Sequence, residues 1–166
     1  MTDSKLLLQA EEYANRCDIP LPFKSRLGSG EEGCVWGTAF DTAIKAFDRE
    51  KNFNLELKAY EILQFNNTSE IKPFNVPRLI GYDEDLLVIE ISIVSPPYLL
   101  DFGKVYFQKP DYPSDAIREY EERIEDHFGK NIIHVRAALY ELELMGIYYA
   151  DANSRNICCD GIPESS

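Results

Sequence analysis

The sequence predicts a mixed α+β fold, and three observations carry this prediction. Glycine, β-branched and aromatic residues dominate segment 23–47, which is typical of short strands joined by tight turns. Segment 50–65 places apolar residues at intervals of four and three from Phe53 to Leu63, the pattern of an amphipathic helix. Further helical patterns follow Ser114. Helix, strands, helix, strands and helices in that order indicate an α+β domain.

The first half of the chain can be divided into elements in order. Asp3 or Ser4 can cap a first helix, and the segment with Pro20 and Pro22 then breaks it. Three strands are expected within 23–47: one leads into the glycines, and the others are CVWGTAF and TAIKAF. The amphipathic helix then follows directly.

The second half begins with a loop and a hairpin. Residues 76–94 form the hairpin pattern, with its turn at Asp83-Glu84-Asp85. The proline-rich segment 95–113 is expected to cross to a helix that Ser114 caps. A last helical pattern, 131–146, should bury one apolar stripe, and the chain then becomes extended.

Composition limits the classes of function. The chain of 166 residues is long enough for a real core, and its net charge of −12 argues against a broad nucleic-acid-binding face. Its first residues resemble neither a signal peptide nor a membrane span, so no membrane partner is expected. Four cysteines without metal-ligand spacing favour a reduced, cytoplasmic protein.

A glycine-rich turn is the first candidate site. The pattern GxGxxGxV is matched by Gly28-Ser29-Gly30-Glu31-Glu32-Gly33-Cys34-Val35. This pattern alone also fits dinucleotide-binding folds and plain turns. Because β-branched and aromatic residues follow, the glycines should cap a hairpin rather than open a helix. Such a hairpin can fold its backbone over phosphates, with Val35 on one face of an adenine ring; a hairpin without a ligand is the alternative.

A lysine in the next strand strengthens the nucleotide interpretation. In Ala43-Ile44-Lys45 the lysine is expected to point inward from an apolar strand, where its charge needs anionic partners. Phosphate oxygens and one helix carboxylate would supply them. Glu56 and Glu61 are both candidates, and Glu56 is favoured because Tyr60 then packs beneath it. A solvated helix face is the alternative for either acid.

These pieces, in this order, resemble the protein-kinase-like superfamily over roughly residues 23 to 161. The resemblance implies a hinge strand at Leu86–Ser92, with Ile89 as gatekeeper. Backbone groups of Glu90 and Ser92 would then face the adenine edge. It further implies a complete small β-rich lobe with its helix, and a shortened helical large lobe.

The resemblance also implies a domain division and a catalytic loop. Residues 1–22 would be an N-terminal helix and linker, 23–94 the small lobe, and 95–166 a large lobe that ends just after the loop. The loop is expected at Ile147–Ile157. In that family Asp151 would orient or deprotonate the acceptor hydroxyl.

The same resemblance assigns roles to the remaining residues. Lys45 would hold the α- and β-phosphates of ATP, and Glu56 would direct the lysine. Asn156 would help to hold Mg²⁺. ATP and Mg²⁺ are therefore the cofactors that the resemblance implies.

The loop departs from the family pattern in two ways. Tyr149 stands where kinases usually have His, and Asn153 stands where Ser/Thr kinases carry Lys. These departures bring the loop closer to atypical and small-molecule kinases.

The largest departure concerns the second metal ligand. In the family an Asp-Phe-Gly motif follows the loop Asn by about a dozen residues, which would lie past Ser166. Asp101-Phe102-Gly103 matches the motif but lies roughly fifty residues before Asp151. We therefore interpret this tripeptide as part of the segment between the lobes and leave the second ligand unassigned.

Three interpretations stay open. The chain is a compact phosphotransferase acting on a protein or small-molecule hydroxyl, a non-catalytic pseudokinase that binds nucleotide or a protein partner, or an incomplete copy of a longer kinase. The retained glycines, Lys45, Asp151 and Asn156 favour nucleotide binding, and the missing acid argues against efficient transfer.

Overall fold

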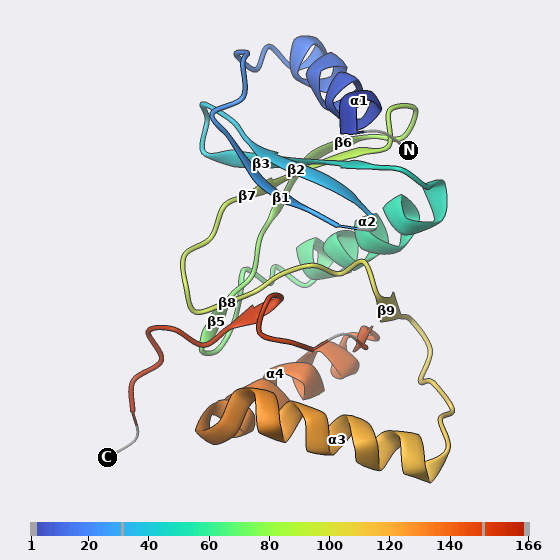
Figure 1. The fold of residues 1–166 in the computed structure, drawn as a ribbon, viewed down its shortest axis with the longest axis vertical. Coiled ribbons are helices and arrows are strands. Elements are labelled where there is room, and N and C mark those ends of the chain that lie inside the picture. The colour runs from blue at the N-terminus through green and yellow to red at the C-terminus, as the bar shows by residue number, and fades with distance from the viewer. Residues whose placement is uncertain (1–2, 31, 151, 165–166) are drawn as a thin grey trace.

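The computed structural model describes residues 3–30, 32–150 and 152–164 (Figure 1). The helices are α1 (Asp3–Arg16), α2 (Glu50–Phe65), α3 (Ser114–Phe128) and α4 (Ile132–Leu144), with a 3-10 turn η1 (Gly129–Asn131). The strands are β1 (Ser25–Ser29), β2 (Gly33–Gly37), β3 (Thr42–Phe47), β4 (Glu70–Ile71), β5 (Phe74–Asn75), β6 (Leu79–Asp83), β7 (Val88–Ser92), β8 (Tyr98–Leu99), β9 (Val105–Tyr106), β10 (Tyr148–Tyr149) and β11 (Ile157–Cys158). The predicted mixed α+β class is confirmed.

A five-stranded antiparallel sheet forms the upper part of the molecule, in the order β1-β2-β3-β7-β6. Lys45 of β3 lies opposite Val35 of β2 and Ile89 of β7, so these three side chains share one face. Ile44 pairs with Glu90 on the other face. Helix α2 covers the first face and α1 covers the second (Figure 1).

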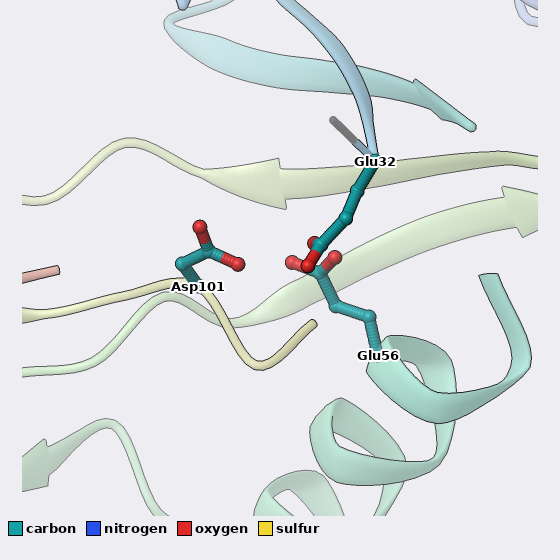
Figure 2. Close-up of side chains that lie close together, drawn as sticks. All are labelled: Glu32, Glu56 and Asp101. Carbon is teal, nitrogen blue, oxygen red and sulfur yellow. The ribbon is translucent and has the colours of Figure 1, made fainter. Parts of the chain in front are cut away.

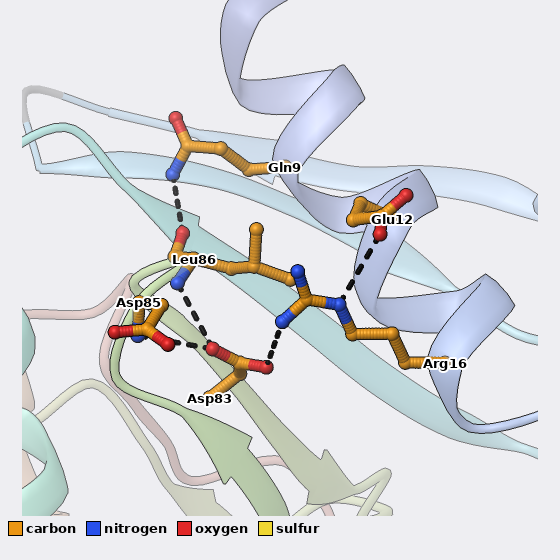
Figure 3. Close-up of polar contacts among 6 residues, drawn as sticks. All are labelled: Gln9, Glu12, Arg16, Asp83, Asp85 and Leu86. Carbon is orange, nitrogen blue, oxygen red and sulfur yellow. Dashed lines mark hydrogen bonds and ion pairs between the residues drawn. The ribbon is translucent and has the colours of Figure 1, made fainter.

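Helix α1 is attached to the sheet by polar as well as apolar contacts. Gln9 donates to the Leu86 carbonyl oxygen over 2.7 Å, and Arg16 pairs with Asp83 over 2.9 Å at the turn between β6 and β7 (Figure 3). The buried Tyr13 hydroxyl donates over 3.0 Å to the carboxylate of Glu90, which also accepts from Thr42. The helix therefore satisfies a carboxylate that is buried within the sheet.

The lower part contains α3 and α4 and two small sheets. β9 pairs with β10, and a four-stranded sheet has the order β11-β8-β5-β4. The region expected to be a loop therefore contains β4 and β5, and the crossing segment contains β8 and β9. Strands of two residues are too short to show a period, which is why the sequence pattern does not reveal them.

Several predicted elements match the structure closely. Helix α2 has the expected bounds, and its apolar stripe from Phe53 to Leu63 is buried. Ser114 begins α3 as its first helical residue instead of capping it, whereas Gly129 ends the helix with a φ of 52°. No helix in the described part of the chain combines the length and apolar character that crossing a bilayer requires.

We expect Tyr13→Phe to destabilise the protein by about 1.5–3 kcal/mol, because it removes a hydrogen bond to a buried charged group. Urea unfolding would measure the loss. Tyr82→Phe is the matched control, since Tyr82 is 46% exposed and should tolerate the change. Equal midpoints for the two variants would show that α1 does not hold Glu90.

Candidate functional site

Lys45 lies at the centre of a buried charged cluster. Strand β3 directs its side chain toward α2, and the ammonium donates to the Glu56 carboxylate over 2.7 Å. The Lys45 side chain is 11% exposed and that of Glu56 is 2% exposed. The structure thus brings together the lysine and the carboxylate that the sequence favoured, while Glu61 is exposed on the same helix.

Asp101 is one of two residues of the cluster that sequence reasoning missed, and Glu32 is the other. The Asp101 carboxylate lies 3.6 Å from the Lys45 ammonium, so the Asp-Phe-Gly tripeptide belongs to the site. The tripeptide lies in the segment between β8 and β9, as expected, and in addition brings its carboxylate to the cluster. Asp101 adopts a φ of 65°, and its Oδ1 accepts a hydrogen bond from the Gly103 N–H. The Asp-Phe-Gly motif could have indicated this residue. The motif comes before Asp151 along the chain, however, and so the sequence did not show that it lies beside Lys45.

A third carboxylate enters from the glycine-rich turn. Glu32 lies 3.8 Å from the Lys45 ammonium and is 13% exposed. Ligand atoms of Glu32, Glu56 and Asp101 all lie within 4.8 Å of one another, and Figure 2 shows the three carboxylates converging. The described part of the cluster therefore holds three acids around one ammonium.

The glycine-rich turn approaches the sheet closely at one position. A Cβ on Gly33 would lie 2.0 Å from the Ala46 carbonyl oxygen, so β2 can pair with β3 here only through glycine. Gly28 and Ser29 end β1, and the Gly30 N–H donates to the Gly33 carbonyl oxygen over 3.0 Å. The predicted hairpin is present.

The expected adenine surface lies beside the cluster. Val35 is half-buried on the Lys45 face, opposite Lys45 itself, and Ala43 is buried in β3 two residues before it. Glu90 sits in the central strand β7 with neighbours on both sides, and the Ser92 N–H donates to the Arg78 carbonyl oxygen over 2.9 Å. The adenine contact of these two backbones stays a prediction.

The segments on either side of Asp151 are attached to the Asp101 segment. The Leu100 N–H donates to the Asn156 carbonyl oxygen over 2.8 Å, and the Ala150 N–H donates to that of Lys104 over 3.2 Å. Asp151 itself lies outside the described residues. The structure thus places the buried Asn156 directly beside the residue that precedes Asp101.

Three aromatic rings connect the same segments to α2. Phe102 packs edge-on against Tyr60, one turn after Glu56, with ring centroids 5.3 Å apart. It packs in the same way against Tyr149, with centroids 5.7 Å apart. The Tyr149 hydroxyl donates to the Leu100 carbonyl oxygen. This chain of rings fixes Asp101 relative to Glu56.

The cluster shifts the pKa of both partners in the ion pair. Burial opposes the charge of Lys45, but the carboxylates of Glu56, Asp101 and Glu32 outweigh it and raise the lysine pKa. Burial raises the pKa of Glu56 to about 7; Lys45 opposes that shift and Asp101 adds to it. Three acids that share one ammonium attract a proton more strongly than an isolated carboxylate does.

Comparisons with known proteins add little to this geometry. No family model and no curated protein matches the chain. Among solved structures, the chain is similar to that described as "Structure of the streptomycin-ATP-APH(2")-IIa ternary complex", with a TM-score of 0.41 and 10% sequence identity. The match covers 71% of this chain and 34% of that one, so the chain spans about a third of that protein's length.

We expect stability to fall as the pH rises through about 7, because the folded-state pKa of Glu56 lies above its ordinary value of 4.5. The folded protein then holds a proton that the unfolded chain releases, so this stabilisation is complete below 4.5 and lost above 7. One such proton is worth about 1.4 kcal/mol per pH unit within that window.

Urea unfolding at several pH values would measure this slope. Glu56→Gln should flatten the slope, whereas Glu61→Gln, on the exposed side of the same helix, should leave it unchanged. An unchanged slope in Glu56→Gln would show that the proton is held elsewhere.

Proposed function

We propose that this chain is a kinase-like, ATP-binding phosphotransferase that acts on a protein or small-molecule hydroxyl. The observation that carries the proposal is the buried Lys45–Glu56 pair with Asp101 beside it. A buried ion pair contributes little net stability, and apolar residues of similar volume often serve a core better. In protein kinases the lysine of such a pair binds the phosphates of ATP and the glutamate holds the lysine in place, which is a chemical reason to keep the pair.

Asp101 fits the role of the acid that the sequence left unassigned. In kinases the Asp of Asp-Phe-Gly and the Asn of the catalytic loop hold the metal ions together. Here β8 leads into Asp101 and pairs with β11, which begins immediately after Asn156. The two segments are neighbours in space although their order along the chain is reversed.

The donor set suits a hard cation. Asp101 offers carboxylate oxygens and Asn156 an amide oxygen, and oxygen ligands are those that Mg²⁺ prefers. When bound, such an ion would neutralise charge on the phosphates. Lys45 would bind the phosphates directly, and Glu56 would hold the lysine in that direction. Asp151 would orient the acceptor hydroxyl, so that positioning and charge stabilisation supply the rate.

One observation favours a second candidate, nucleotide binding without transfer. Asn153 takes the position where Ser/Thr kinases carry Lys, and its side-chain oxygen accepts from the Arg155 N–H over 2.8 Å. The amide thus shapes the loop and brings no positive charge to it. A pseudokinase that only binds nucleotide would show the same Lys45–Glu56 geometry.

We expect ATP to raise the melting temperature of the wild-type protein, because a ligand at 100 times its Kd stabilises the folded state by about 2.7 kcal/mol. Lys45→Met should remove the shift. Lys24→Met is the matched control, since Lys24 is exposed at 67% of its side chain. An equal shift in the wild type and Lys45→Met would remove Lys45 from nucleotide binding, and no shift in the wild type would end the proposal.

Transfer itself is tested by ATP turnover with Mg²⁺. Asp101→Asn and Asp151→Asn should each lower the rate by at least about 100-fold, since each removes charge from the reacting centre. Asp111→Asn, an exposed acid in the segment before α3, should leave the rate unchanged. ATP binding without turnover in the wild type would select the pseudokinase candidate, and full turnover in Asp101→Asn would exclude Asp101.

A further inference from the structure

Glu32 occupies an unusual position for an acid in a glycine-rich turn. Side chains between β1 and β2 could point into solvent, yet Glu32 points toward α2 and Asp101 (Figure 2). Its Oε2 lies 3.8 Å from the Lys45 ammonium, and the side chain is only 13% exposed. The turn therefore places a negative charge beside the lysine.

The Glu32 carboxylate also rests on the segment that follows Asp101. A Cβ built on Gly103 would lie 1.8 Å from Glu32 Oε2. A Cβ at that position would require the flexible Glu32 side chain to move, so Gly103 leaves the space that the Glu32 carboxylate fills. Glu32 thus bridges the turn and the Asp101–Gly103 segment.

The net negative charge of the cluster around Lys45 disfavours the binding of a further anion. The Lys45 ammonium is shared by Glu32, Glu56 and Asp101, which leaves the cluster with an excess of negative charge. Glu56 holds the lysine from below at 2.7 Å, whereas the Glu32 contact is longer and comes from the side of the turn. An incoming anion can therefore replace Glu32 at lower cost than Glu56.

We propose that Glu32 is a self-inhibitory latch of the phosphate site. Its carboxylate takes the place beside Lys45 that a phosphate of the nucleotide would take, and the nucleotide binds only when that carboxylate leaves. This inference rests on the proposed function and adds a regulation of the same site.

The backbone around Glu32 defines how the latch opens. The Glu32 carbonyl oxygen accepts from the Asp48 N–H over 3.3 Å, so the main chain is attached to the end of β3. A Cβ on Gly28 or Gly30 would meet nothing within 4 Å, so the turn has open space beside it. The latch opens by rotation of the Glu32 side chain into that space, while the main chain stays attached.

The test is ATP binding without divalent cations, measured by calorimetry in excess EDTA on wild-type protein and Glu32→Gln. The glutamine keeps the shape and removes the charge, so the Kd for ATP should fall about tenfold. Glu32→Asp, which keeps the charge but shortens the reach, should also bind more tightly than the wild type. Asp41→Asn removes an acid that is 83% exposed at another turn of the sheet, and its Kd should equal that of the wild type.

The outcomes separate the latch from the proposed function. An equal or weaker affinity in Glu32→Gln overturns the latch while the nucleotide site stands. A gain in affinity that Asp41→Asn reproduces overturns it too, since the cause is then net charge. If neither the wild type nor Glu32→Gln binds ATP, in EDTA or with Mg²⁺, the proposed function falls and the latch falls with it.

Discussion

The Lys45 ammonium is the group on which the arrangement of the molecule depends. A buried cation must be paired, and three different segments supply its partners: the glycine-rich turn, helix α2 and the segment at Asp101. The buried Glu56 carboxylate would be unfavourable in this place without the lysine, and the lysine would be unfavourable without a carboxylate beside it. The cluster therefore determines where α2 and the Asp101 segment lie relative to the sheet. The aromatic contacts from Tyr60 through Phe102 continue that constraint into the lower part of the molecule.

The sheet can present Lys45 accurately because both of its faces are covered. Alternation along β3 directs Lys45 toward α2 and its neighbour Ile44 toward α1. Register is strongly specified in such a strand. A slip of one residue would turn Lys45 toward α1 and Ile44 toward α2. The buried Glu90 adds a polar constraint, because its carboxylate accepts hydrogen bonds from the side chains of Tyr13 and Thr42. Helix α1 thus supports the sheet from the face opposite Lys45.

The parts of the structure that the sequence predicts are those with local signals. Helix α2 follows from its apolar period, and the Lys45–Glu56 pair follows from the need of a buried lysine for an acid. Asp101 and Glu32 could not be placed in this way. Asp101 reaches the site through the pairing of β8 with β11, a contact between distant parts of the chain made by strands of two residues. Glu32 has the composition of a solvated turn, and its contacts with Lys45 and Gly103 appear only in the folded protein.

The reversed order of the Asp101 segment and the Asn156 segment has a simple physical basis. A pair of antiparallel strands is held by hydrogen bonds between its neighbours, and these bonds are the same whichever strand comes first along the chain. The β9–β10 pair and the β8–β11 pair therefore bring Tyr149 and the residue after Asn156 beside the segment that contains Asp101. The order of the strands along the chain determines which loops connect them. The chemistry of a site depends only on which side chains lie close together. The order of a motif along the chain therefore cannot exclude it from a site; only its position in the folded protein can. Here Asp101 lies 3.6 Å from the Lys45 ammonium.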